Sequence, residues 1–198
     1  MGQIAAATQL VMPVEHLIDL RCHPSLRSRW VRDIQVLVRR SASDELHMKY
    51  FLNGDIPQIR IPLASAPRIG TQLWQHTCFE AFVAVDGQSA YHEFNFAPSG
   101  EWAVYAFLGY RNRGPHVNEI MPPRIAVRCT QNRLQLDTLV RLGGLSTIHH
   151  RVPLRLGLSA VIESSDGLSY WALRHPAGKP DFHNADGFAL VVEPPCLE

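Results

Sequence analysis

The chain has 198 residues, of which 46% are apolar and 19% are charged, a composition typical of a globular domain and not of a disordered segment. Its formal net charge of +1 gives no electrostatic reason to expect binding to nucleic acid or to an acidic membrane surface, because both need clustered positive charge. We therefore predict one domain over residues 1–198 that binds neither nucleic acid nor a membrane.

The cysteines and the N-terminus indicate the compartment. None of the four cysteines, Cys22, Cys78, Cys129 and Cys196, belongs to a CxxC pair, so a structural zinc site is not expected. Residues 1–16 have neither the basic start nor the long apolar stretch of a signal peptide, and no run approaches the roughly 18 apolar residues of a membrane helix. These features predict a cytoplasmic protein with reduced thiols.

Period-two alternation of apolar residues, interrupted by turn residues, dominates the chain from residue 34 onward. Helix signals are weak, and only 13–20 and 144–151 could form short helical turns. In chain order, the predicted strands cover 34–40, 45–52, 77–85, 90–96, 102–108, 124–130, 133–140, 154–163, 168–173 and 187–193. About ten strands at this spacing predict an all-β antiparallel sandwich of the jelly-roll or immunoglobulin-like type.

The alternation over 77–85 places Phe79 and Ala81 on one face of a strand and Glu80 and Phe82 on the other. A carboxylate in so apolar a strand needs a partner or a ligand, because burial of an unpaired charge is costly. Alternatively, this face is simply exposed to solvent, as on many antiparallel sheets.

Glu93 and Asn95 share one face of the next predicted strand, which follows a turn-forming Asp-Gly pair. If the hairpin brings that face beside Glu80, two carboxylates, an amide and the Tyr91 hydroxyl line one patch, which suits a ligand rich in hydroxyl groups. The alternative is a solvated edge, because the sequence does not secure the pairing register.

Segment 171–183 is a rigid and polar loop that contains two prolines and a glycine. Its charged or titratable members are Arg174, His175, Lys179, Asp181 and His183. Such a segment resembles the wall of a site more than a simple connector, although a long crossover held by its own hydrogen bonds is the alternative. The proline-rich segment 53–73 is a candidate for the rim of a site.

Two of the four tryptophans could take part in binding. A sugar ring packs its C–H groups against aromatic faces, while its hydroxyls need polar partners at the rim. Trp74 lies just before a predicted strand and Trp171 lies within one, so both could flank a pocket. For any single tryptophan, a place in the core is the commoner outcome.

The remaining patterns give weak evidence for catalysis. The sequence has no HExxH, GxSxG, GxxxxGK[ST] or GxGxxG motif. Nothing orients His76 as a base toward Cys78, so a thiol nucleophile is not expected. Glu80 and Glu93 form a glycosidase pair only if their separation fits.

Other basic residues also favour no site. Arg111 and Arg113 could clamp a carboxylate or a phosphate, but a solvated turn is the favoured interpretation. The adjacent His149 and His150 diverge on a strand, so a metal site there is not expected.

Three blocks of sequence resemble a known group of proteins. They are LWQHTCFEAFV (73–83), YHEFNFAPSGEWAVYAF (91–107) and YWALRHPAGKPDFHNADGFAL (170–190). In this order they resemble the DOMON-like superfamily, and more narrowly its bacterial branch related to the family 9 carbohydrate-binding module, over about residues 73–192. The resemblance implies an antiparallel β-sandwich that binds a sugar or haem.

In the sugar-binding relatives, two tryptophans enclose a terminal sugar and a carboxylate on a nearby strand binds its hydroxyls. The resemblance implies these roles for Trp74, Trp171 and Glu80, with Asn95 and Arg111 as further candidates. Haem-binding relatives use a methionine with a histidine or lysine as axial ligands. No spacing singles out such a pair among Met48, Met121, His47, His92 and His183.

We therefore predict a non-catalytic module that binds a small molecule, specifically a sugar, without a cofactor or a metal. The alternatives are a haem-binding protein and, less favoured, an enzyme that acts on glycosides. The predicted binding residues are Trp74, Glu80, Glu93, Asn95, Trp171, His175, Asp181 and His183.

Overall fold

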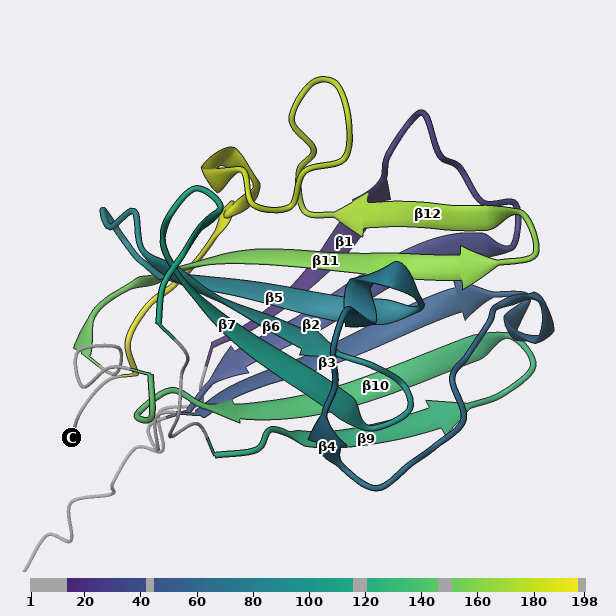
Figure 1. Cartoon of the computed structure of the whole chain (residues 1–198), viewed down its shortest axis with the longest axis horizontal. Helices are drawn as coiled ribbons and strands as arrows, with labels where there is room; N and C mark the ends of the chain where they lie inside the picture. The colour runs from purple at the N-terminus through teal and green to yellow at the C-terminus, as the bar shows by residue number, and fades with distance from the viewer. Residues whose placement is uncertain (1–13, 42–44, 116–120, 146–150, 196–198) are drawn as a thin grey trace, which may run out of the picture.

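The computed structural model describes residues 14–41, 45–115, 121–145 and 151–195, and within them the chain is almost entirely β (Figure 1). The strands are β1 (Glu15–Cys22), β2 (Val31–Arg40), β3 (Glu45–Gly54), β4 (Arg68–Ile69), β5 (Cys78–Val85), β6 (Tyr91–Phe96), β7 (Glu101–Gly109), β8 (Asn112–Arg113), β9 (Arg124–Cys129), β10 (Arg133–Arg141), β11 (Leu154–Ser164), β12 (Gly167–Ala172) and β13 (Leu190–Val192). Short 3-10 turns, η1 (Ile56–Gln58), η2 (Leu73–Gln75) and η4 (Ala185–Gly187), interrupt them. In these ranges no helix has the length and apolar character needed to cross a membrane.

The strands form one curled sheet with two layers. Its order is β4-β7-β6-β5-β11-β12-β1-β2-β3-β10-β9, with β13 paired to β11 and β8 to β7. Strand β1 joins the layers, because residues 15–20 pair with β2 whereas Arg21 and Cys22 pair with β12. We call β2, β3, β10 and β9 the first layer, and β7, β6, β5, β11 and β12 the second layer. Apart from the short β4–β7 pair, the pairings are antiparallel, which confirms the predicted fold class.

The main hydrophobic core lies between the two layers. Val36 and Tyr50 of the first layer and Phe79 and Leu156 of the second are all fully buried members of it. The rings of Tyr50 and Phe79 meet across the layers with centroids 5.1 Å apart. In β3 and β10 buried and partly exposed residues alternate, whereas β5 and β11 are buried on both faces. Other parts of the chain therefore cover the outer face of the second layer.

The ten predicted strands are all present, and the described ranges contain three more that were not predicted, β1, β4 and β8. Residues 13–20 were predicted as a possible helical turn, but β1 (Glu15–Cys22) is a strand whose burial alternates with period two. Cross-strand pairing with β2 decides this segment, because its intrinsic helix signal is weak. The short β4 and β8 have too few residues for a period to be visible. The second possible helical turn, 144–151, lies largely outside the described residues.

Candidate functional site

The candidate site lies on the outer face of the second layer. Strand pairing places side chains in rows across this face, since paired residues of antiparallel strands point the same way. One row consists of Ser159, Glu80, Asn95 and Ala103. The next consists of Gly157, Phe82, Glu93 and Tyr105. Glu93 and Asn95 share one face, as predicted, and the register between β5 and β6 places Glu80 on it, which the sequence had left open.

A pocket of about 400 Å³ opens above these rows, and we call it the Glu80 pocket. Two carboxylates, two arginines and one histidine provide its polar lining, and aromatic side chains provide most of the rest. The lining residues are Trp74, Glu80, Phe82, Glu93, Tyr105, Phe107, Arg111, Arg113, Val161, Tyr170, Pro180, Phe182 and His183. They come from six strands, from η2, from the turn between β7 and β8 and from the loop after β12. Figure 1 shows that loop above β11 and β12.

The two carboxylates on this face are deeply buried, with 3% of Glu80 and 6% of Glu93 exposed. Ser159 Oγ donates a hydrogen bond of 3.4 Å to Glu80 Oε2, and Asn95 Nδ2 donates one of 2.6 Å to Glu93 Oε1. Burial, reinforced by the nearby charge of Glu93, raises the pKa of Glu80 well above its ordinary value. Burial also raises the pKa of Glu93, although the Asn95 hydrogen bond opposes the shift.

Asn95, which was predicted to bind ligand, supports the site instead. It is fully buried beneath the pocket lining. Its amide is held from both sides, because the Cys78 thiol lies 3.6 Å from Oδ1 as a donor while Nδ2 bonds Glu93. Asn95 therefore fixes the Glu93 carboxylate.

His183 lies in the pocket wall as predicted, and a hydrogen-bonded chain fixes it. Its Nδ1 lies 2.8 Å from the Tyr91 hydroxyl, which also accepts a bond of 3.2 Å from the main-chain N–H of Arg111. Its Nε2 lies 3.6 Å from Glu93 Oε2. Burial, followed by the Arg111 charge, lowers the pKa of His183 to about 4. His183 is therefore neutral near pH 7.

Asp181 holds the pocket mouth and is not itself among the lining residues. It accepts hydrogen bonds from Tyr110 Oη at 2.7 Å, from Arg111 at 2.8 Å and from the main-chain N–H of His183 at 3.2 Å. Burial opposes ionisation of Asp181, but the bonds from Tyr110 and Arg111 outweigh it and lower its pKa. The loop after β12 is thus fastened to the turn between β7 and β8.

The predicted pair of opposed tryptophans is wrong. Trp74 does stand at the pocket, 39% exposed, with its ring 6.2 Å from that of Tyr105 in an edge-on arrangement. Trp171 instead lies in the main core, 5% exposed, and its Nε1 donates to Ser169 Oγ at 3.1 Å. Because neighbouring residues of a strand point to opposite faces, the side chain of β12 that lines the pocket is Tyr170.

His175 also lies away from the pocket lining. Its Nε2 lies 2.8 Å from the carbonyl oxygen of Arg21, and its ring packs edge-on against His23 at 4.9 Å. It supports the pocket only through Phe182, whose ring centroid is 6.3 Å away. The predicted rim segment 53–73 contributes no lining residue, because the rim begins at Trp74, just after it.

Sequence reasoning missed most of the aromatic wall. Tyr105, Phe107, Tyr170 and Phe182 all line the pocket, but they lie in three separate segments of the sequence, β7, β12 and the loop after β12. The alternation in residues 101–109 was a usable signal, because Tyr105 pairs with Glu93 across β6 and β7. Arg111 and Arg113, for which a solvated turn was favoured, also line the pocket. Arg113 lies over the Tyr105 ring at 4.1 Å.

The candidate haem ligands are not gathered in the Glu80 pocket; His47 and Met48, neighbours on β3, line a hollow on the first layer instead. Met48 is buried in the main core, whereas Met121 is exposed and contacts Arg141. Among the candidates only His183 lines the Glu80 pocket. In the described part of the chain, no group of three or more His, Cys, Asp or Glu side chains could hold a metal ion. The paired histidines 149 and 150 lie outside that part.

The geometry does not favour either catalytic alternative, the thiol nucleophile or the glycosidase pair. His76 bonds Glu163 at 2.8 Å, whereas Cys78 is buried beside Asn95, so no thiol–imidazole pair forms. Glu80 and Glu93 are diagonal neighbours on adjacent strands and rise from the same floor. A glycosidase pair instead flanks the scissile bond on two sides.

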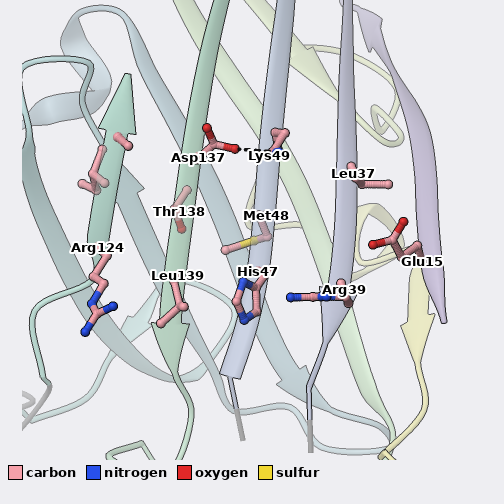
Figure 2. A pocket seen from close by; sticks show the side chains of 12 residues that line it. Glu15, Leu37, Arg39, His47, Met48, Lys49, Arg124, Asp137, Thr138 and Leu139 are labelled. Atoms are coloured by element: carbon pink, nitrogen blue, oxygen red, sulfur yellow. Dashed lines mark ion pairs between the residues drawn. The ribbon is translucent and has the colours of Figure 1, made fainter. Parts of the chain in front are cut away.

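A second hollow of about 400 Å³ lies on the outer face of the first layer (Figure 2). Charged and aliphatic side chains line it, without a Phe, Tyr or Trp. Lys49 and Asp137 neutralise each other there across neighbouring strands at 3.3 Å, as Figure 2 shows. This pattern is typical of a solvent-facing antiparallel sheet, so we assign the candidate site to the Glu80 pocket.

Comparison with known proteins finds similarity in structure only. No protein-family model and no curated protein matches the chain. A Bacteroides uniformis protein to which carbohydrate binding has been provisionally ascribed matches with a TM-score of 0.67, over 88% of this chain and 84% of that one, at 10% identity. A family 9 carbohydrate-binding module of Caldicellulosiruptor kristjanssonii, solved with cellotriose, matches with a TM-score of 0.50, over 82% and 74%, at 9% identity. These similarities establish a shared fold, in agreement with the resemblance found in the sequence.

Proposed function

We propose that this chain is a non-catalytic module that binds a carbohydrate in the Glu80 pocket. The observation that supports this proposal is that two buried carboxyl groups lie on the pocket floor and aromatic rings form the pocket wall. A sugar needs both features, because its hydroxyls require directional polar partners and its C–H faces pack on aromatic rings. The fold shared with sugar-binding modules supports the same reading.

Each pocket group has a distinct role in this proposal. The half-exposed Trp74 ring supplies the stacking face at the mouth. Glu93, held by Asn95, accepts hydroxyl hydrogen bonds. Glu80 can both donate and accept, because its raised pKa favours the protonated form. The pocket volume of about 400 Å³ lies in the range of small-molecule sites.

Isothermal calorimetry and tryptophan fluorescence against a panel of mono- and disaccharides test the proposal. We expect at least one sugar to bind, and Trp74→Ala to weaken its binding about tenfold or more through loss of stacking area. Phe51→Ala is the matched control, because Phe51 lies on the first layer and pairs with Gln35 and Gln135, away from the Glu80 pocket. The proposal is contradicted if no sugar in the panel binds, or if Trp74→Ala binds the sugar as tightly as the natural chain does.

Two further measurements separate the alternatives. A haem protein would develop a Soret band on addition of hemin, whereas we expect no such band. A glycosidase would release nitrophenol from nitrophenyl glycosides, whereas we expect binding without turnover. The cytoplasmic location stays a prediction, which fractionation of the source cells would test.

A further inference from the structure

The floor of the Glu80 pocket carries two buried carboxyl groups without a matching cation. The ion pairs of the described residues include none at Glu80, whose one hydrogen bond there comes from the Ser159 hydroxyl. Glu93 has the Asn95 amide at 2.6 Å and His183 Nε2 at 3.6 Å. His183 is neutral near pH 7, so it supplies no charge. Burial of two such carboxylates is costly unless a positive group compensates them.

The two cationic side chains that line the pocket, Arg111 and Arg113, lie at its mouth and not on its floor. Arg111 is bound to Asp181 at 2.8 Å, with half of its side chain exposed. Arg113 is exposed and stacks over Tyr105 at 4.1 Å. Both lower the pKa of Glu93 from a distance, and neither contributes to the shift at Glu80. A positive group that allows both carboxyl groups to ionise must therefore come from the guest.

We propose that the sugar bound in the Glu80 pocket is an amino sugar, whose protonated amine sits on the floor between the carboxylates of Glu80 and Glu93. This proposal rests on the proposed function and names the class of sugar. The aromatic wall favours the same guest, because a cation is attracted to the faces of Trp, Tyr and Phe rings. Trp74, Tyr105 and Tyr170 all line the pocket.

Binding of an ammonium group should be accompanied by loss of a proton from the floor. In the empty pocket burial and the neighbouring Glu93 favour the protonated Glu80, whereas an ammonium guest favours the carboxylate. The titratable groups packed around Glu80 are Cys78 on its own strand, Glu93 on β6 and Tyr50 on the facing layer. Burial raises the pKa of Cys78 and of Tyr50 well above their ordinary values, so Glu80 and Glu93 are the groups that exchange protons.

Calorimetric titration with matched sugar pairs tests the proposal. The probes are glucosamine with glucose, galactosamine with galactose, and mannosamine with mannose, at a pH where the amines are protonated. At least one amino sugar should bind tenfold or more tighter than its parent hexose and than its N-acetyl derivative. Repeating the titration in two buffers of different ionisation enthalpy should reveal proton release for the amino sugar alone.

Two variants locate the amine. Glu80→Gln keeps the shape and removes the charge, so the ratio of amino-sugar affinity to parent-hexose affinity should shrink to about twofold. Glu93→Gln should act in the same direction, which provides a second reading if one variant folds poorly. Glu15→Gln is the matched control, because Glu15 is exposed on β1, and it should retain the full preference.

The outcomes separate the two proposals. Parent hexoses that bind as tightly as amino sugars, or a glucuronic acid that binds tighter than both, overturn the amine while carbohydrate binding stands. Amino-sugar binding without proton release, or with an undiminished preference in both variants, also overturns it. If no sugar binds at all, the proposed function itself fails.

Discussion

The phenolic hydroxyl of Tyr50, on β3, donates a hydrogen bond of 2.8 Å to the main-chain carbonyl of Glu80, on β5. Both residues are buried, and they belong to opposite layers. The main core thus fixes the strand segment that carries the site from behind. Tyr50→Phe leaves this arrangement one buried hydrogen bond short, so we expect a loss of about 1 kcal/mol in the free energy of unfolding. Chemical denaturation measures it, and an unchanged midpoint would show that the bond stabilises nothing.

Glu80 should make stability depend on pH. Because its pKa in the folded protein is raised above the ordinary 4.5, the folded state binds more protons than the unfolded state above pH 4.5. Stability is therefore lost as pH rises, by up to about 1.4 kcal/mol per pH unit. Glu80→Gln does not titrate, so its advantage over the natural chain should grow from pH 5 to pH 8. If the difference between the denaturation midpoints of the two proteins stays constant from pH 5 to pH 8, burial does not raise the pKa of Glu80.

His183 should titrate far below an ordinary histidine. NMR of the imidazole should give a midpoint of about 4, because burial and Arg111 disfavour the charged ring. The unfolded chain binds this proton near pH 6.5, so the contribution of His183 to stability is lost as pH falls from about 6.5 to 4. Arg111→Gln should raise the midpoint. Arg39→Gln, on the first layer, should leave it unchanged, and equal midpoints in both variants would contradict the assigned cause.

Trp171 should matter for stability and not for binding. Trp171→Phe leaves a void in the main core, and we expect it to cost about 1–2 kcal/mol. Sugar affinity should change by less than twofold, because the indole lies away from the Glu80 pocket. Trp74→Ala should give the converse, with stability changed by less than about 1 kcal/mol. Calorimetric binding and urea denaturation of both variants test this division, and weak sugar binding by a folded Trp171→Phe would restore the tryptophan pair.

Gly157 makes room for the loop that covers the site. A Cβ at this position would stand 2.6 Å from Phe188 Cδ1 and 3.3 Å from Phe82 Cβ. Gly157→Ala therefore pushes Phe188 outward, at a cost of about 1–3 kcal/mol. Gly109→Ala meets no atom within 4 Å and serves as the control. A double variant with Phe188→Leu should recover part of the loss, and a Gly157→Ala protein as stable as the control would disprove the close packing.

The strands could be predicted because their signal is local. In β5 the residues that alternate in sequence separate in space, with Phe79 and Ala81 in the main core and Glu80 and Phe82 in the pocket. Steric geometry imposes this alternation on every strand, whatever its partners. Strand β1 was missed, because its side chains are mostly exposed. Its pairing with β2 makes this segment a strand.

The site was predicted in part. Trp74, Glu80, Glu93 and His183 line the pocket, while Asn95 supports it from behind and Asp181 fastens its mouth. Trp171 and His175 were misplaced. In both cases the sequence region was right and the direction of the side chain was wrong. That direction depends on which face of β12 and of its following loop meets the core, and this is a property of non-local pairing.

The sequence by itself determined the all-β class, the positions of ten strands and the shared face of Glu93 and Asn95, because period two is fixed by the backbone of each strand. The pairing of β5 with β6 decided that Glu80 lies on that face too. Only the tertiary structure decided that Tyr170 faces the pocket while Trp171 enters the core, and that aromatic rings from distant segments gather over the carboxylates. Those choices follow from strand register and from the loop that covers the outer face. Both come from contacts between residues far apart in the chain, which no local pattern records.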